Sequence, residues 1–201
     1  MKITPLDRIL LLFTGLLAAY QVAVGINELE NVPIIAYTIA FGVLLVAGLL
    51  LIILGFEVLD SPIVVVVSTI IPLSLSLGLV WEHLALWRVA YLTFTICGFM
   101  AILLTRFLPT QGKLPTIVLA IIHGMAGMVI FLLPSILSAN GTTRPGFALV
   151  GLGGALIGIG GLLLSFLKTG KPILPRNTIL RILPGLLLLM TAAFVAGFAL
   201  A

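Results

Sequence analysis

The stretch IIAYTIAFGVLLVAGLLLIILGF, residues 34–56, decides the fold of this chain. It contains no charged residue, and its apolar residues run on without the alternation of a half-buried strand. A helix of about 20 apolar residues crosses the ~30 Å hydrocarbon core of a bilayer, whereas a membrane β-strand is an alternating segment of ~10 residues. The stretch therefore predicts a membrane-spanning helix.

Six further uncharged apolar stretches of similar length fill most of the remaining chain, at residues 9–27, 63–81, 89–105, 114–134, 146–167 and 182–201. Only 8% of the residues are charged, against about 25% in soluble domains. Because backbone groups in lipid must be paired within each segment, we predict an all-α fold. This fold is a polytopic membrane helix bundle of seven transmembrane helices, a single integral membrane domain over residues 1–201.

The positions of the basic residues predict the orientation in the membrane. With the N-terminus in the cytoplasm, only Arg88 and Arg144 lie outside, and the other Lys and Arg residues lie inside, namely Lys2, Arg8, Arg106, Lys113, Lys168, Lys171, Arg176 and Arg181. This bias follows the positive-inside rule. We therefore predict a multi-pass protein of the cell (inner or plasma) membrane with its C-terminus outside. The net charge of +4 then reflects topology, so we expect the lipid bilayer, and no nucleic acid, as a partner.

The first apolar stretch has some features of a signal peptide, whose basic region would contain Lys2 and Arg8. The stretch is long for a signal sequence, and its one small-x-small candidate near the end, Ala23-Val24-Gly25, is a weak cleavage site. We therefore expect the first helix to be retained.

Proline and glycine positions predict an internal repeat. Pro33, directly before the second stretch, is followed nine residues later by Gly42, and Pro115 is followed by Gly124 at the same spacing in the fifth stretch. Three helices per repeat is an odd number, so the second copy would be upside down. This gives a 3+3 inverted repeat plus one helix, as in many secondary transporters. The alternative is that proline is simply favoured in the first turn of any helix.

The third and sixth stretches carry residues that break or closely pack helices. Pro72 removes one backbone hydrogen bond from the third helix, and the hydroxyls expected to satisfy the freed carbonyl are Ser68, Thr69, Ser74 and Ser76. The sixth stretch is rich in glycine and includes Gly151, Gly154 and Gly158. Interrupted helices form the midplane site of repeat-built transporters. The alternative is helix packing, in which Gly154 and Gly158 form a close-contact pair and the serines repair the backbone.

His123 is the only histidine, acid or base deep within a predicted span. At ~1.5 Å per residue it lies ~13 Å from the start of its helix, close to the bilayer centre. An intramembrane ionisable residue is a candidate for function, so we place it in a midplane site between the third, fifth and sixth helices. The alternative is a neutral histidine that is hydrogen-bonded to a neighbouring helix.

Glu82 and His83 lie at the outer end of the third stretch, between Trp81 and Trp87. The tryptophans resemble an interfacial aromatic belt, so the two polar residues are either solvated or line an outer vestibule. Two adjacent ligands are too few for a metal site.

At the inner side, Glu57 and Asp60 occupy a short turn, which is either solvated or forms an ion pair with Arg106. Residues 168–181 form the most basic loop, in which two prolines argue against a long helix.

Three functions remain open. The first is a small-molecule or ion transporter, or a channel-like protein, and this is our prediction. The second is a non-catalytic structural or assembly subunit of a larger membrane complex, with partner membrane subunits or a homo-oligomer. The third is a membrane-embedded redox protein that binds haem or quinone. The sequence lacks Gly-x-Ser-x-Gly, His-Glu-x-x-His and Cys-x-x-Cys motifs. It therefore favours a protein that is not an enzyme, with no catalytic residues, metal or cofactor predicted.

Overall fold

The computed structural model describes residues 3–26, 30–108, 112–168 and 173–201. This part of the chain is all-helical and contains no strand. Seven of its helices are long and apolar enough to cross a membrane, as predicted. Their bounds are α1 (Pro5–Val24), α2 (Asn31–Leu54), α3 (Pro62–His83), α4 (Arg88–Phe107), α5 (Leu114–Ala139), α6 (Ala148–Lys168) and α7 (Arg176–Ala199). The shorter 3₁₀ turns are η1 (Phe56–Asp60), η2 (Ala85–Trp87) and η3 (Pro145–Phe147).

The start of α1 is set by a local signal. The Thr4 hydroxyl accepts a hydrogen bond from the Asp7 backbone N–H (3.2 Å), and the Asp7 carboxylate accepts one from the Thr4 N–H (2.8 Å). This capping box, with Pro5 as the first helical residue, satisfies N–H groups that would otherwise have no partner. The helix therefore begins at Pro5, four residues before the predicted stretch 9–27.

Prolines inside three helices do not end them. α3 continues through Pro72, α5 through Pro134, and α7 through Pro184. The predicted interruption of the third helix is therefore wrong, and α6 is likewise continuous through its glycines. The expectation of a non-helical segment up to residue 181 is also wrong, because α7 begins at Arg176. Without competing water, a helix that loses one backbone hydrogen bond keeps its remaining ones.

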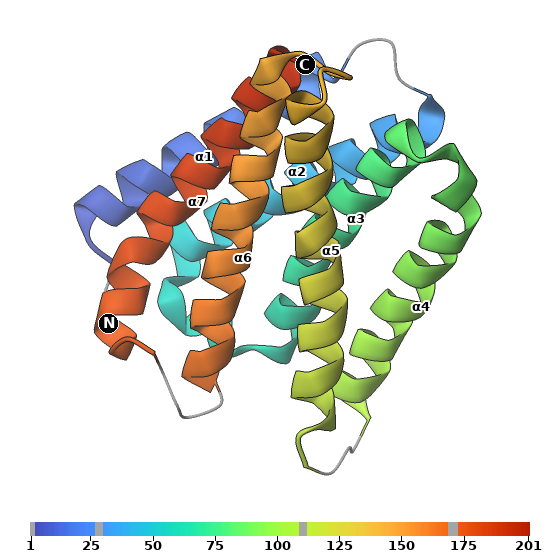
Figure 1. Cartoon of the computed structure of the whole chain (residues 1–201). Coiled ribbons are helices and arrows are strands. Elements are labelled where there is room, and N and C mark those ends of the chain that lie inside the picture. Colours follow the sequence, from blue (N-terminus) through green and yellow to red (C-terminus); the bar gives the residue numbers. More distant parts are fainter. Residues whose placement is uncertain (1–2, 27–29, 109–111, 169–172) are drawn as a thin grey trace.

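Six of the helices form a closed ring. α1 packs against α2, α2 against α3, α3 against α5, α5 against α6, α6 against α7, and α7 against α1. α4 lies outside this ring, against α3 and, less extensively, α5 (Figure 1). We call the end at which α1, α3, α5 and α7 begin the lower end, and the end at which they finish the upper end. Because α1 closes the ring, the first apolar stretch is part of the packed bundle. Retention of this helix stays a prediction.

The neighbours of each helix do not follow the pattern that an inverted repeat requires. Exchange of helices 1–3 with helices 4–6 would give α1 and α4 equivalent surroundings. Instead, α1 is part of the ring and α4 is outside it. The α3–α4 interface would also need a counterpart between α6 and α1, and within the described ranges α6 packs extensively only against α5, α7 and the η3 turn that precedes it. The inverted repeat stays a prediction without support from the packing.

Candidate functional site

One apolar core fills the upper half of the ring. Its buried residues come from all six ring helices and from η3, and include Ala18, Tyr37, Phe41, Leu75, Ile130, Phe147, Val150, Phe194 and Phe198. Aromatic rings meet at its centre: the Tyr37 and Phe198 centroids are 4.8 Å apart, and Phe41 meets Phe194 edge-on at 6.5 Å. Such tilted and edge-to-face pairs are favourable. The upper half of the bundle is therefore closed.

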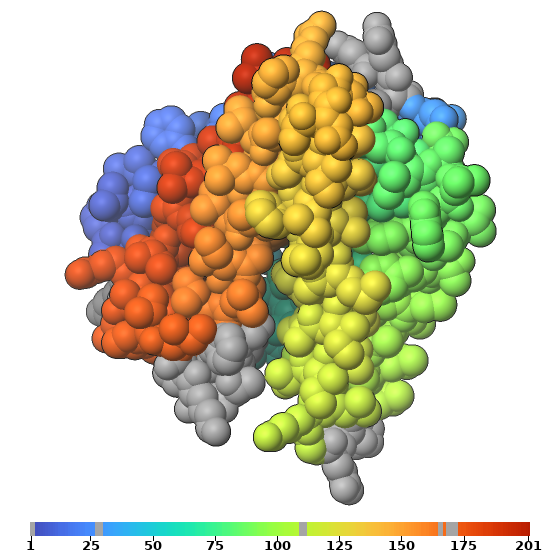
Figure 2. Space-filling model, viewed as in Figure 1, coloured from blue at the N-terminus to red at the C-terminus, as the bar shows by residue number. Residues whose placement is uncertain are grey.

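The lower half has two separate apolar clusters. One joins α1, α2, η1 and α7 through Leu11, Leu51, Phe56, Leu180 and Leu183. The other joins α3, α4 and α5 through Val66, Leu73, Ile102, Ile122 and Ala126. Among the described side chains of α6, Leu164 packs against the first of these two clusters and none packs against the second. The surface is hollowed between α6 (orange) and the lower part of α5 (yellow-green), with teal atoms of the α3 region visible behind (Figure 2).

The contact between α5 and α6 changes along the two helices. Near the upper end, a Cβ added to Gly154 would lie 2.7 Å from the backbone carbon of Ile130 and 2.7 Å from the backbone nitrogen of Phe131. The two backbones therefore touch there, as small residues allow. One turn further along the same face, nothing lies within 4 Å of the corresponding position at Gly158. Gly158 therefore makes no close contact with α5, and the prediction that Gly154 and Gly158 both pack against a neighbouring helix is wrong for Gly158.

His123 bridges the separation between the two helices. Its Nε2 lies 3.1 Å from the position that a Cβ on Gly161 would occupy, one turn below Gly158 on α6. The imidazole forms no hydrogen bond with any side chain or backbone group that the structure describes. The alternative of a histidine hydrogen-bonded to a neighbouring helix therefore has no support among these residues. No local pattern in the sequence pairs His123 with Gly161.

Gly151 lies on the same face of α6 as Gly154. A Cβ at this position would lie 2.8 Å from the Phe131 carbonyl oxygen and would also meet the Ser135 hydroxyl. Both predicted glycines therefore belong to the tight upper part of the α5–α6 interface, above the position of His123.

The hydroxyls of α3 bond to their own helix. Ser76 donates to the carbonyl of Pro72 at 2.6 Å. Ser68 and Thr69 both donate to the carbonyl of Val65, at 3.0 and 2.7 Å. None of these bonds reaches the Ser68 carbonyl, which is the group that lacks a helical donor because of Pro72. The expectation that these hydroxyls repair that carbonyl is therefore wrong.

Ser74 forms no hydrogen bond with another described residue. It precedes Gly78 by one turn, and a Cβ at Gly78 would lie 2.5 Å from the Tyr37 ring, so Ser74 is on the α2-facing side of α3. α5 lies between α3 and α6 in the ring. No hydrogen bond among the described residues joins Pro72 or the α3 serines to His123.

Glu82 and His83 are tied to the aromatic core. Tyr37 donates a long hydrogen bond, 3.3 Å, to one Glu82 carboxylate oxygen, and His83 Nε2 lies 3.7 Å from the other. The His83 ring also meets Phe147 edge-on at 5.2 Å. The Glu82 and His83 side chains keep 31% and 15% exposure, so neither is fully solvated. Tyr37 is the residue that sequence analysis missed here.

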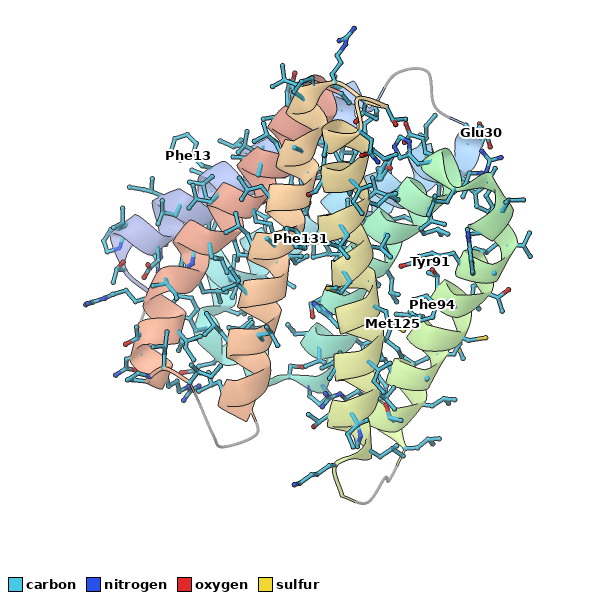
Figure 3. All side chains as sticks on the ribbon, in the orientation of Figure 1. Phe13, Glu30, Tyr91, Phe94, Met125 and Phe131 are labelled. Carbon is cyan, nitrogen blue, oxygen red and sulfur yellow. The ribbon has the colours of Figure 1, made fainter. Side chains whose placement is uncertain are left out.

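A second polar group at the upper end joins α2, α3 and α4. One Glu30 carboxylate oxygen accepts from Trp81 Nε1 and the other from Arg88 Nη2, both at 2.9 Å. Arg88 also donates to the Trp81 carbonyl at 2.6 Å and lies over its indole ring. The hydrogen bonds from Trp81 and then from Arg88 lower the pKa of Glu30. Figure 3 shows Glu30 at the upper edge.

We expect the hydrogen bonds of the Glu30 carboxylate to contribute to stability in a way that depends on pH. A lowered folded-state pKa means that the contribution is complete above the usual glutamate pKa of about 4.3 and is lost as the pH falls through the folded-state value. The unfolding temperature should therefore fall more between pH 6 and pH 3 in the wild type than in Glu30→Gln. Parallel curves for the two proteins would contradict a bond between the charged Glu30 and its partners.

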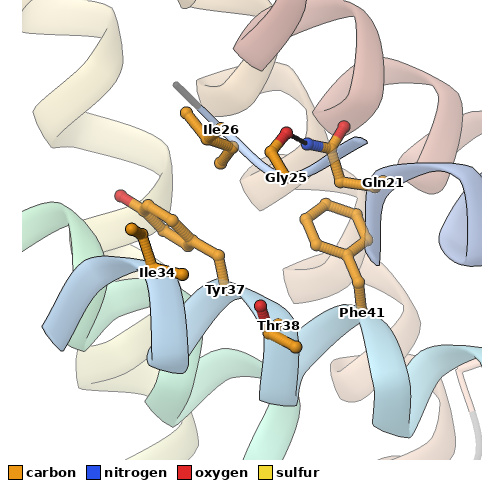
Figure 4. Close-up of a pocket in the computed structure, with 7 residues that line it drawn as sticks. All are labelled: Gln21, Gly25, Ile26, Ile34, Tyr37, Thr38 and Phe41. Atoms are coloured by element: carbon orange, nitrogen blue, oxygen red, sulfur yellow. Dashed lines mark hydrogen bonds between the residues drawn. The ribbon is translucent and has the colours of Figure 1, made fainter. Parts of the chain in front are cut away.

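A small cavity of about 10 Å³ lies beside Tyr37, lined also by Gln21, Ile34, Thr38 and Phe41 (Figure 4). This volume holds about one water molecule. The Gln21 amide donates to the carbonyl of Gly25 at 2.9 Å across the end of α1. The cavity is therefore a place for a structural water rather than for a substrate.

The lower end has an ion pair that differs from the predicted one. Arg176 Nη2 lies 3.1 Å from the Asp60 carboxylate, and the described structure shows no pair between Arg106 and either acid of the η1 turn. The Nε of Arg106 is buried without a hydrogen bond. The hypothesis of a pair with Arg106 is therefore wrong. Arg176 replaces it because α7 starts earlier than predicted and brings Arg176 beside η1.

Comparison of the chain with protein-family models, with curated proteins and with solved structures found no match. Within the described residues, no group of three or more His, Cys, Asp or Glu side chains is placed to hold a metal ion.

Proposed function

We propose that this protein is a membrane transporter or channel-like protein for a small molecule or an ion. The observation that carries the proposal is the change in packing along α5 and α6. The helices touch at Gly154, are apart at Gly158, and are bridged by His123 at Gly161. A closed upper half and a divided lower half suit a protein whose central site opens towards one end.

In this proposal His123 is the group that binds the solute or carries a proton. A neutral imidazole has one donor and one acceptor nitrogen, and it changes charge near physiological pH. Gly161 has no side chain and so lets the imidazole approach α6 closely, and the space at the Cβ position of Gly158 is open. The site thus lies between α5 and α6, with α3 behind it, and the predicted α3 serines and glycines Gly151 and Gly154 serve as its supporting structure.

We propose that the lower end faces the cytoplasm. Of the described basic residues, those at the lower end are Arg8, Arg106, Lys113, Lys168, Arg176 and Arg181, while Arg88 and Arg144 lie at the upper end. Lys2 and Lys171 lie outside the described residues. This asymmetry supports an N-terminus in the cytoplasm and a C-terminus outside, so the divided half of the bundle would open inwards.

Water access to Gly158 tests the site. In a Cys97→Ser background in nanodiscs, we expect a water-soluble methanethiosulfonate to label Gly158→Cys at least ten times faster than Met125→Cys. The reagent reacts with a thiolate, which forms in water and not in lipid. Met125 is a matched control because it belongs to α5, two residues from His123, and is 51% exposed on the outer surface (Figure 3). Equal rates would mean a dry gap and would remove the proposed site.

Transport itself is tested with the same variant. A panel of small solutes and ions is screened for those that slow the labelling of Gly158→Cys. Flux of such a solute into proteoliposomes should fall at least tenfold in His123→Ala and stay unchanged in Met125→Ala. Unchanged flux in His123→Ala would exclude this residue from the mechanism.

A second proposal is a subunit of a larger membrane complex or a homo-oligomer, and the position of α4 favours it. This helix lies outside the ring, and its only buried residues are Gly98 and Ile102. Cys97 is exposed on the same helix. Cross-linking through Cys97 to a partner chain or a second copy in native membranes would support this proposal, and monomeric protein under the same conditions would contradict it.

A further inference from the structure

A cleft opens at the lower end of the bundle, far from His123. It lies between the start of α1 and the end of α2 with the η1 turn, and its volume is about 350 Å³. Arg8 and Glu57 line it together with the apolar side chains of Ile3, Ile52, Ile53 and Leu54. A volume of this size is in the range of small-molecule sites. Because α1 begins and α2 ends here, the cleft is at the level of the membrane interface.

Among the described residues that line the cleft, Arg8 and Glu57 are the charged ones. Arg8 and Glu57 do not form an ion pair with one another, and neither side chain hydrogen-bonds to another described residue. The neighbouring acids are engaged, since Asp7 caps α1 and Asp60 pairs with Arg176. A guanidinium and a carboxylate thus line one cleft without being paired to one another.

The apolar wall of the cleft continues onto the outer surface of α2. Ile53 is 74% exposed and Leu54 is 55% exposed, so both would face lipid chains in a membrane. A ligand that enters from the bilayer would therefore keep its apolar part on these side chains and place its polar part between Arg8 and Glu57.

We propose that this cleft binds the headgroup of an aminophospholipid, a lipid with one phosphate and one primary ammonium group. The Arg8 guanidinium matches the phosphate, to which it donates charge-assisted hydrogen bonds. The Glu57 carboxylate accepts hydrogen bonds from the ammonium group. An anionic headgroup without an amine would put negative charge beside Glu57, and a choline headgroup has no N–H to donate. The site is separate from the proposed transport site and does not depend on it.

Native mass spectrometry of protein exchanged into equal amounts of three lipids with identical acyl chains tests the proposal. The probes are phosphatidylethanolamine, phosphatidylglycerol and phosphatidylcholine. We expect the wild type to retain at least five times more phosphatidylethanolamine than either other lipid. Arg8→Ala should reduce that retention to the phosphatidylcholine level. Glu57→Gln should bring phosphatidylethanolamine and phosphatidylglycerol to about equal retention.

Lys113→Ala is the matched control, because Lys113 is another exposed cation at the lower end that does not line the cleft. Its lipid retention should equal that of the wild type. Arg8, Glu57 and Lys113 are exposed, and unchanged unfolding temperatures in the three variants would show that they fold. Equal retention of all three lipids, preference for phosphatidylglycerol, or the same result for Arg8→Ala and Lys113→Ala would each overturn the proposal.

Discussion

Replacement of Gly154 by alanine is expected to destabilise the bundle by about 2–3 kcal/mol, the upper part of the range for overpacked interiors. The added Cβ would lie 2.7 Å from backbone atoms of both Ile130 and Phe131. Backbone atoms cannot rotate away as the end of a side chain can, so α5 and α6 would have to move apart. This interface belongs to the closed upper half of the ring, and its loss would loosen the core around it.

Gly158→Ala is the matched control on the same helix face. Nothing lies within 4 Å of its Cβ position, so we expect no loss of stability and a gain of up to about 1 kcal/mol from the better helix propensity of alanine. Both variants are compared with the wild type by equilibrium unfolding in one membrane mimetic. Equal destabilisation by the two substitutions would contradict the separation of α5 from α6 at Gly158.

The seven helices were predictable because each is decided locally. An apolar stretch of membrane length forms a helix whatever its neighbours are, and the observed helix bounds differ from the predicted ones by at most six residues, at the start of α7. At α1, Thr4 and Asp7 form a capping box that the sequence contains and that hydropathy does not report. At α7, the helix starts at Arg176, directly after Pro175, and includes Arg181, the charged residue at which the predicted loop 168–181 ended.

The closed ring and the outer position of α4 could not be predicted from the sequence. In a soluble protein the buried face of a helix is more apolar than the exposed face. Here the exposed side chains are as apolar as the core: Ile53 is 74% exposed and Leu11 is fully buried. When both faces carry the same residue types, the pattern does not say which helices are neighbours.

The candidate site was predictable in part. His123 stands out because an ionisable residue in an apolar span is rare. Its contact with Gly161 joins residues 38 positions apart on different helices, and no local signal encodes such a pair. The α3 hydroxyls illustrate the opposite case. These residues were predicted to form part of the site because their side chains are polar. Their hydroxyls instead bond to their own helix, which is the usual use of serine and threonine in apolar helices.

Phe194→Ala is expected to cost about 3 kcal/mol of stability. The ring is fully buried, meets Phe41 edge-on at 6.5 Å, and has atoms 2.6 Å from the position that a Cβ on Gly153 would occupy. Truncation of a buried aromatic residue in soluble proteins costs about 3–5 kcal/mol. We expect the lower end of that range, because burial within a membrane protein replaces lipid contact rather than water contact, while the cost of the cavity remains.

Phe13→Ala tests whether the stability lost in Phe194→Ala comes from the loss of packing between helices. Phe13 is on α1 and is 52% exposed on the outer surface (Figure 3), so its removal leaves no cavity between helices and should change stability by less than about 0.5 kcal/mol. Both variants are measured by equilibrium unfolding in the same lipid. Phe194 holds α6 and α7 to α2 in the closed half, so its loss should also raise the labelling of Gly158→Cys. A similar loss in both variants would mean that the aromatic rings stabilise the bundle through lipid contact, and that the upper half is not held shut by its core.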